Sequence, residues 1–137
     1  MTYKEKVAYL ESYQSILLRI DGLSHELQKW EDIAVRINQN YSQVPFAGSG
    51  NNSKVEGAAV NAANISHVIY LDLISAIQAR DSIKRVINER CKKLRYRELI
   101  EAHYIHGLSM GKIARNQKRE YQATWKMMKS AIDSLDI

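Results

Sequence analysis

Apolar side chains recur at helical spacing along the first forty residues. From Ile20 the steps alternate between three and four residues through Leu23, Leu27, Trp30, Ala34, Ile37 and Tyr41. This heptad-like stripe predicts one long helix over residues 3–41, which has a single apolar face and needs a partner. Plain core packing accounts for Trp30 and the tyrosines on that face.

A break rich in turn-forming residues follows. Residues 42–54 contain Pro45, Gly48, Gly50 and a pair of asparagines, all of which are typical of loops. The Gly-Ser-Gly run resembles a phosphate-binding loop only superficially, because no Gly-Lys-Ser/Thr follows at the required spacing. We therefore predict a connecting loop and no nucleotide site.

A second apolar stripe predicts a helix over residues 54–91. Ser53 fits its N-cap, and Glu56, three residues later, completes a capping box. The stripe comprises Val55, Ala58, Ala59, Ala62, Ile65, Ile69, Leu73, Ala76, Ile83 and Ile87. The simplest arrangement is a long antiparallel helical hairpin over residues 1–91. Because two helices alone bury little core, we expect the hairpin to form a homodimer or to dock on the C-terminal part.

Shorter helices are predicted in the C-terminal third. Residues 92–107 form a helix that ends at Gly107, a residue suited to a left-handed C-cap. Ser109 is an N-cap candidate for a helix over about 110–116. After a turn at residues 117–119, Glu120 opens a last helix. Its inward positions are Thr124, Met127, Met128, Ala131, Ile132 and Leu135. The predicted fold is all-α: a helical hairpin, then a helix-turn-helix domain over residues 92–137.

The distribution of charge separates the same two parts. Residues 1–91 hold ten Lys/Arg and ten Asp/Glu, whereas residues 92–137 hold ten and five, so the C-terminal third carries the entire net charge of +5. A neutral body with a basic end indicates a local surface for a polyanion. A solvated charged face that binds nothing is the alternative.

Composition excludes several other classes. The single Cys91 excludes an internal disulfide and disfavours a cysteine-based metal site. His103 and His106 are three residues apart, but no carboxylate or thiol completes a ligand set, so no metal is expected. Ser, His and Asp lack any catalytic constellation, and we expect neither an enzyme nor a cofactor. The absence of a signal core or a long uninterrupted apolar run predicts a cytoplasmic protein without a membrane partner.

The C-terminal pattern resembles a known family. Residues 97–114 read Arg-Glu-Leu-Ile-Glu-Ala-His-Tyr-Ile-His-Gly-Leu-Ser-Met-Gly-Lys-Ile-Ala, and Ala131-Ile132 with Leu135 closes the pattern. This arrangement resembles region 4 of bacterial sigma factors. The long first helix, Pro45, the Gly-Ser-Gly run and Lys54-Val-Glu add a resemblance to the ArpU/RinA-type regulators of phages and related mobile elements. The resemblance implies a transcription regulator, expected to activate late packaging and morphogenesis genes in the cytoplasm of a bacterial host.

Helix-turn-helix geometry then assigns the candidate residues. Residues near the start of the last helix reach base edges, which nominates Tyr121, Gln122 and Lys126, with Trp125 beside them. Arg115, Lys118, Arg119 and Lys129 would hold phosphates, and Lys112 is a weaker candidate. For Trp125, packing against the upstream helices is an equal alternative, and for the lysines a solvated face is the alternative. The partners implied are double-stranded DNA, RNA polymerase and a phage or satellite regulatory protein.

The chain departs from the family pattern at two places, the turn and Thr124 in the last helix. The family's turn reads Leu-Gly-apolar-Ser, whereas this chain has Gln117-Lys118-Arg119-Glu120, so the missing glycine predicts another route of the backbone through the corner. An apolar Val is common in the family where Thr124 stands.

Two other functions fit the same pattern. A phage small terminase subunit also combines a DNA-recognising helix-turn-helix with long helices, although its reader is usually N-terminal. A helical adaptor or anti-activator would bind RNA polymerase or another regulator through the hairpin, without a DNA site of its own.

Overall fold

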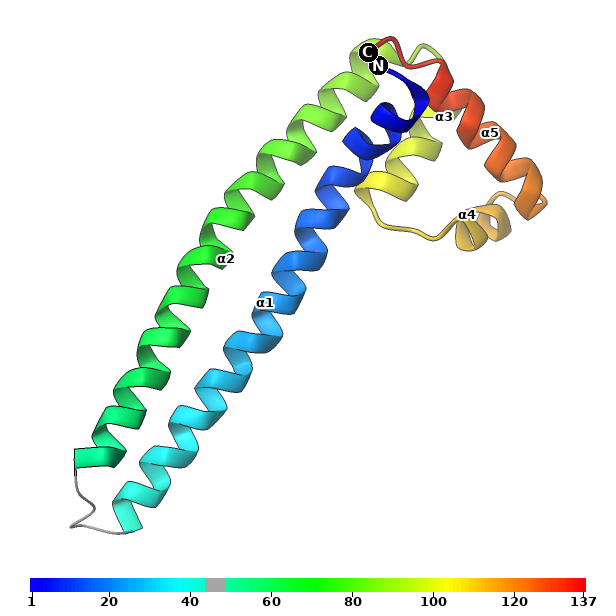
Figure 1. Cartoon of the computed structure of the whole chain (residues 1–137). Coiled ribbons are helices and arrows are strands. Elements are labelled where there is room, and N and C mark those ends of the chain that lie inside the picture. Colours follow the sequence, from blue (N-terminus) through cyan, green and yellow to red (C-terminus); the bar gives the residue numbers. More distant parts are fainter. Residues whose placement is uncertain (44–48) are drawn as a thin grey trace. The chain divides into compact units, whose positions relative to one another are not determined.

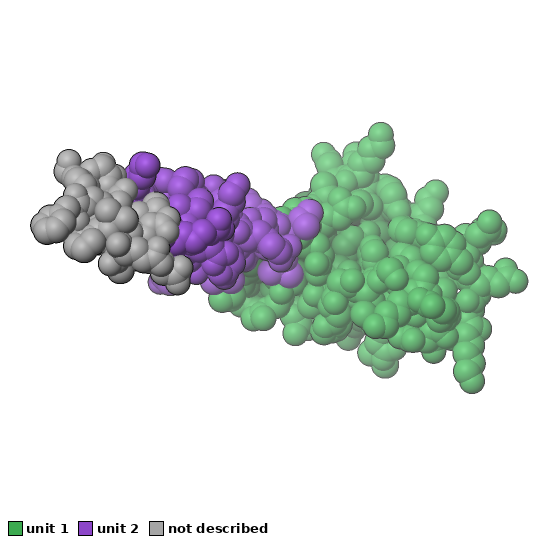
Figure 2. Space-filling model, turned by 90° about the horizontal axis from the view of Figure 1, so that it is seen from below, with its two compact units in different colours: residues 1–16, 75–137 green, residues 17–74 purple. Residues whose placement is uncertain are grey.

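The chain is all-helical in a computed structural model that describes residues 1–43 and 49–137, with side chains for 1–36 and 54–137 (Figure 1). The elements in order are α1 (Tyr3–Gln43), α2 (Ser49–Arg90), α3 (Leu94–Ile100), the π-helical turn η1 (Glu101–Ile105), α4 (Met110–Asn116) and α5 (Tyr121–Asp133). The prediction of an all-α fold with a long helix pair is confirmed. Contacts divide the chain into unit 1, residues 1–16 with 75–137, and unit 2, residues 17–74 (Figure 2). The division predicted after residue 91 was based on the distribution of charge, whereas the division into units 1 and 2 is based on contacts between residues.

The second long helix begins earlier than the sequence pattern predicts. α2 starts at Ser49, so the N-cap at Ser53 and the capping box with Glu56 are wrong. Glycine and asparagine are weak helix formers, but each costs at most about 1 kcal/mol and is tolerated in a first turn, where the N–H groups lack intrahelical partners in any case. Of the predicted loop, residues 44–48 lie outside the described residues.

Unit 2 is a pair of antiparallel helical segments from α1 and α2 (Figure 1). The predicted α1 stripe is half-buried at Ile20, Leu23, Leu27, Trp30 and Ala34, which confirms it there, while the side chains of residues 37–43 lie outside the described set. On α2, Ala58 is buried and Val55, Ala62, Ile65 and Ile69 are half-buried. Alanines in this seam let the two backbones approach closely.

Asp72 occupies the seam position that the pattern assigned to Leu73. Leu73 is 44% exposed, so its predicted place in the stripe is wrong, and the exposed Ala59 is also outside the seam. The alternation of four and three residues from Ile65 through Ile69 requires position 72 next. Asp72 is tolerated there because its Oδ2 lies 3.0 Å from Nε of Arg19 on α1. This ion pair lacks hydrogen-bond geometry, since Oδ2 has no hydrogen-bond partner among the described residues.

Unit 1 holds the principal hydrophobic core, built from the start of α1, the end of α2 and the C-terminal elements. Its largest fully buried members are Leu10, Ile83, Ile87, Leu99, Ile100, Met128, Ile132 and Leu135, together with the thiol of Cys91. Burial of these side chains fixes α3, α4 and α5 against the start of α1 and the end of α2. Burial also raises the pKa of the Cys91 thiol, so this cysteine is an inert core residue.

A glutamine on α1 anchors the bend between α3 and α4. The side-chain amide of Gln14 donates to the carbonyl oxygens of Tyr104 and Ile105 at 3.2 and 3.1 Å. These carbonyls lie in the wide turn of η1, where the chain leaves helical hydrogen bonding and needs other donors. Gly107 follows with a φ of +70°, which confirms the predicted left-handed C-cap. α4 therefore starts from a fixed corner.

Candidate nucleic-acid interface

α4 and α5 form a pair of short helices joined by a four-residue turn. Ser109 caps α4, because its Oγ accepts the backbone N–H of Lys112 at 3.1 Å, and the predicted N-cap and bounds are confirmed. Ile113 and Ala114 are buried, and α4 packs against α5. The buried small side chain of Ala114 permits this close crossing.

The turn contains the only non-glycine residue with a positive φ in the described part of the chain. Lys118 has a φ of +53°, in the left-handed region. Its N–H donates to the carbonyl of Arg115 at 3.2 Å, and the N–H of Arg119 donates to that of Ala114 at 2.9 Å. This hydrogen-bond pair is a Schellman motif. The expectation of another route through the corner is therefore wrong: Lys118 adopts the conformation that a glycine would adopt.

One face of α5 is buried and the other is free. Thr124, Met128, Ala131 and Ile132 are buried, Met127 is partly buried, and Leu135 beyond the helix end is buried, which confirms the predicted inward stripe. The side chains that point outward include Gln122, Trp125, Lys126 and Lys129. Their positions i, i+3, i+4 and i+7 place them on a common face. We call these four residues the outer α5 face.

Positively charged side chains lie around the beginning of α5. Lys112, Arg115, Lys118 and Arg119 are exposed and precede α5. Glu120 is the only acidic residue between positions 102 and 132. Within the part of the chain that the structure describes, none of these cations, nor Lys126 or Lys129, forms an ion pair. The guanidinium of Arg119 donates to the sulfur of Met127 at 3.0 Å, which holds Arg119 along α5.

Aromatic rings form the edge of the outer α5 face. Tyr121 is 55% and Trp125 is 40% exposed, and their ring centroids lie 6.4 Å apart in an edge-to-face arrangement. The ring of His103 lies 6.1 Å from that of Trp125, also edge-to-face. Trp125 is outside the buried core cluster, so of its two expected roles the structure favours a surface position.

All eight nominated residues thus lie exposed on α4, the turn or α5. The sequence pattern did not predict the contacts of His103. Its Nδ1 lies 2.8 Å from the carbonyl oxygen of Leu108, and its ring packs edge-to-face against the ring of Trp125. The sequence pattern also missed Gln14, which is ninety residues away from its partner Tyr104. No local pattern signals either contact, because both depend on the tertiary fold.

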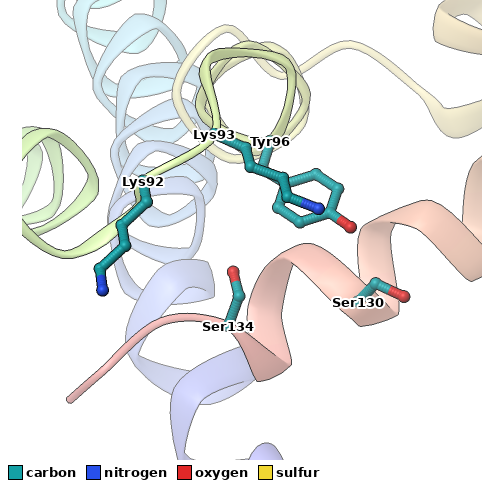
Figure 3. Close-up of a pocket in the computed structure, with 5 residues that line it drawn as sticks. All are labelled: Lys92, Lys93, Tyr96, Ser130 and Ser134. Carbon is teal, nitrogen blue, oxygen red and sulfur yellow. The ribbon is translucent and has the colours of Figure 1, made fainter.

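A cavity of about 290 Å³ lies at the other end of α5, lined by Lys92, Lys93, Tyr96, Ser130 and Ser134 (Figure 3). Its polar groups do not converge on one point. The ammonium of Lys93 lies over the Tyr96 ring, 5.0 Å from its centroid, and the hydroxyl of Ser134 donates to the Ala131 carbonyl at 2.7 Å.

No protein-family model, curated protein or solved structure matches this chain. The likeness to sigma region 4 and to the phage regulators is accordingly a likeness of sequence pattern, and the function is argued from the residues of α4, the turn and α5.

Proposed function

We propose that this protein is a sequence-specific DNA-binding transcription regulator that inserts α5 into the major groove. The observation that carries the proposal is the outer α5 face, on which Gln122, Trp125, Lys126 and Lys129 stand together and neither lysine forms an ion pair among the described residues. An α-helix fits the major groove, and the second helix of a helix-turn-helix presents its N-terminal residues there. α5 has the length and the free face that this role requires.

Phosphates are the expected ligands of the flanking cations. Arg115 lies in the last turn of α4, Lys118 and Arg119 occupy the turn between the helices, and Lys129 lies two turns into α5. Contacts of this kind fix the register of a protein on the duplex and supply most of its salt-dependent affinity. Lys112 is a weaker candidate for a phosphate contact. It is exposed on the first turn of α4.

Residues in the first turns of α5 contact the base edges in this proposal. Gln122 can form two hydrogen bonds with adenine, and Lys126 can reach O6 and N7 of guanine. Tyr121 and Trp125, whose rings contact each other edge-to-face, add apolar contact with thymine methyl groups. The His103 ring packs edge-to-face against the Trp125 ring.

The sequence resemblance narrows the kind of regulator. Similarity to sigma region 4 and to ArpU/RinA-type proteins favours an activator of late phage or mobile-element genes that works with RNA polymerase in the bacterial cytoplasm. A terminase-like DNA subunit would share the α5 chemistry but assemble as a ring. An adaptor without a DNA site would not need the outer α5 face.

Salt-dependent binding tests the proposal. Fluorescence anisotropy with a labelled random duplex should show affinity that falls steeply between 50 and 200 mM salt. The double variant Lys118→Gln, Arg119→Gln should bind all duplexes more weakly. The slope of log affinity against log salt should shrink by about 0.9 for each phosphate that the variant no longer neutralises.

Lys29→Gln, Arg36→Gln is the matched control, since it removes two exposed cations from α1 in unit 2. The proposal predicts a normal slope for this control. Equal weakening by both pairs would indicate only a general effect of net charge, and absence of binding at low salt would favour the adaptor.

A further inference from the structure

The middle of α2 is apolar on two opposite faces. One face forms the seam with α1, through Ala62, Ile65 and Ile69. The opposite face exposes large apolar side chains at Val60, Tyr70, Leu71 and Ile74, and Leu73 lies at its edge beside the seam. We call these five residues, each between 39% and 61% exposed, the outer α2 face. A helix that is apolar around most of its circumference is normally enclosed by neighbours on more than one side. α2 therefore has room for a further partner.

α1 in the same unit has the character of a surface helix. Its outward residues are mostly charged or polar, for example Asp21, Glu26, Lys29 and Asp32. Leu18 and Val35 are the isolated apolar exceptions, at 73% and 54% exposure. Scattered exposed apolar residues are common on soluble proteins, whereas a contiguous patch marks an interaction site. The missing partner thus belongs on α2 and not on α1.

We infer that a second copy of this chain covers the outer α2 face with its own outer α2 face, so that two hairpins form a four-helix bundle. Between residues 57 and 79 the only charged residue is Asp72, which is held in the seam by Arg19. Two copies can therefore meet without repulsion between like charges. The core of a protein interface is typically depleted of charge and enriched in aromatic residues such as Tyr70.

The exposed area suits a dimer. The five side chains leave roughly 450 Å² uncovered on one copy, and two copies with their flanking alanines would bury about 1,000 Å², the lower limit for a specific interface. Size also varies along the face. Small Ala59 and Ala63 flank Val60 at one end and large Leu71 and Ile74 form the other end, so an antiparallel pairing centred near His67 sets Leu71 against Ala63 and Ile74 against the smaller Val60.

A bilayer is the competing occupant. By length and composition alone, the helix segment Lys54–Arg90 is apolar enough to cross a membrane. Asn61, Asn64 and Asp72 lie within its apolar part, and the charged α1 packs along it in unit 2. Burying these groups in hydrocarbon is costly, whereas a second copy leaves the outer face of α1 in water. The dimer is thus the better match.

Sedimentation equilibrium measures the association directly. The wild-type chain should have twice the monomer mass of 15.7 kDa, and Leu73→Glu, Ile74→Glu should raise the dimer dissociation constant at least about tenfold. Leu18→Glu, Val35→Glu is the matched control, because it places two glutamates at exposed apolar positions of α1. It should remain dimeric. Circular dichroism verifies that each variant stays helical.

Cysteine cross-linking tests the same face without disrupting it. Under mild oxidation His67→Cys should form a covalent dimer, and a mixture of Val60→Cys with Ile74→Cys should do so more readily than either alone. The wild-type chain should not, because Cys91 is buried. A wild-type monomer at 100 µM would overturn the proposal, as would a ring of more than two copies. The proposal would also be overturned if the wild-type chain floated with phosphatidylcholine and phosphatidylglycerol vesicles and the Leu73→Glu, Ile74→Glu variant did not.

Discussion

The backbone N–H of Arg119 donates a hydrogen bond to the carbonyl oxygen of Ala114 at 2.9 Å, across the end of α4. This bond closes only if the intervening Lys118 takes a positive φ, which is +53°. A left-handed conformation costs a residue with a Cβ roughly 1–2 kcal/mol. The turn that sets the entry of α5 is thus built on a strained lysine whose charge faces solvent.

Replacing Lys118 with glycine should stabilise the fold and weaken DNA binding at the same time. Glycine removes the left-handed strain, and part of the gain is offset by greater freedom of the unfolded chain, so urea unfolding should show an increase of roughly 0.5–1 kcal/mol. Lys118→Ala is the control: it loses the same charge but keeps the strain. Both variants should lose similar DNA affinity, and a stability gain shared by alanine would contradict the role of the φ angle.

Gln122→Ala should affect only recognition of the cognate site. Gln122 is exposed on α5, so its truncation should leave the unfolding free energy unchanged. A lost pair of hydrogen bonds to a base should cost about 1–3 kcal/mol of binding free energy on the cognate duplex and nothing on random DNA. Gln78→Ala on α2 removes the same exposed side chain elsewhere. Equal losses on cognate and random duplexes would exclude Gln122 as a base reader.

Thr124→Val should leave stability unchanged or raise it slightly. The Thr124 hydroxyl is fully buried and donates to the Glu120 carbonyl at 2.9 Å, but that carbonyl also accepts the Thr124 N–H at 3.0 Å. Valine therefore leaves no acceptor unpaired and removes a buried hydroxyl, so the change in unfolding free energy should stay within about 1 kcal/mol. Thr124→Ala, which also opens a cavity, should be destabilising. A large loss for valine would reveal a partner of the hydroxyl other than Glu120.

Stability should fall in strong alkali because of Tyr104. Burial, with a further contribution from the carboxylate of Glu11, raises the pKa of Tyr104 to about 12. The unfolded chain ionises this phenol near pH 10, whereas the folded chain keeps it neutral, so stability present below pH 10 is lost as the pH rises toward 12. The loss should reach up to about 2 kcal/mol. Urea unfolding of Tyr104→Phe at pH 7 and 11 should show a smaller pH effect than the wild type, and an equal effect would contradict this assignment.

Local signals in the sequence were sufficient for much of the fold. The 3–4 spacing predicted both long helices, and Ser109 and Gly107 predicted the caps that bound α4 and its preceding corner. These signals succeeded because each depends on residues only a few positions apart. The fold class and the inward face of α5 followed from the same periodicity.

Other features depended on contacts that no local pattern reveals. Leu73 is a better core residue than Asp72 by hydrophobicity, yet the seam register and Arg19 select Asp72. The π-helical turn η1 depends on donors from Gln14. The turn residue Lys118 departs from a glycine pattern, but the surrounding packing still imposes a left-handed backbone. The eight candidate binding residues remain predictions, because exposure and charge permit DNA binding without requiring it.

Selection from a random duplex library tests the central claim most directly. Purified protein should enrich one defined motif over successive rounds at 150 mM salt. The Gln122→Ala, Lys126→Ala variant should lose that motif while retaining weak, salt-sensitive binding through Arg115, Lys118 and Arg119. A folded wild-type protein that enriches no motif, or a variant that enriches the same motif as strongly, would contradict recognition of DNA by α5.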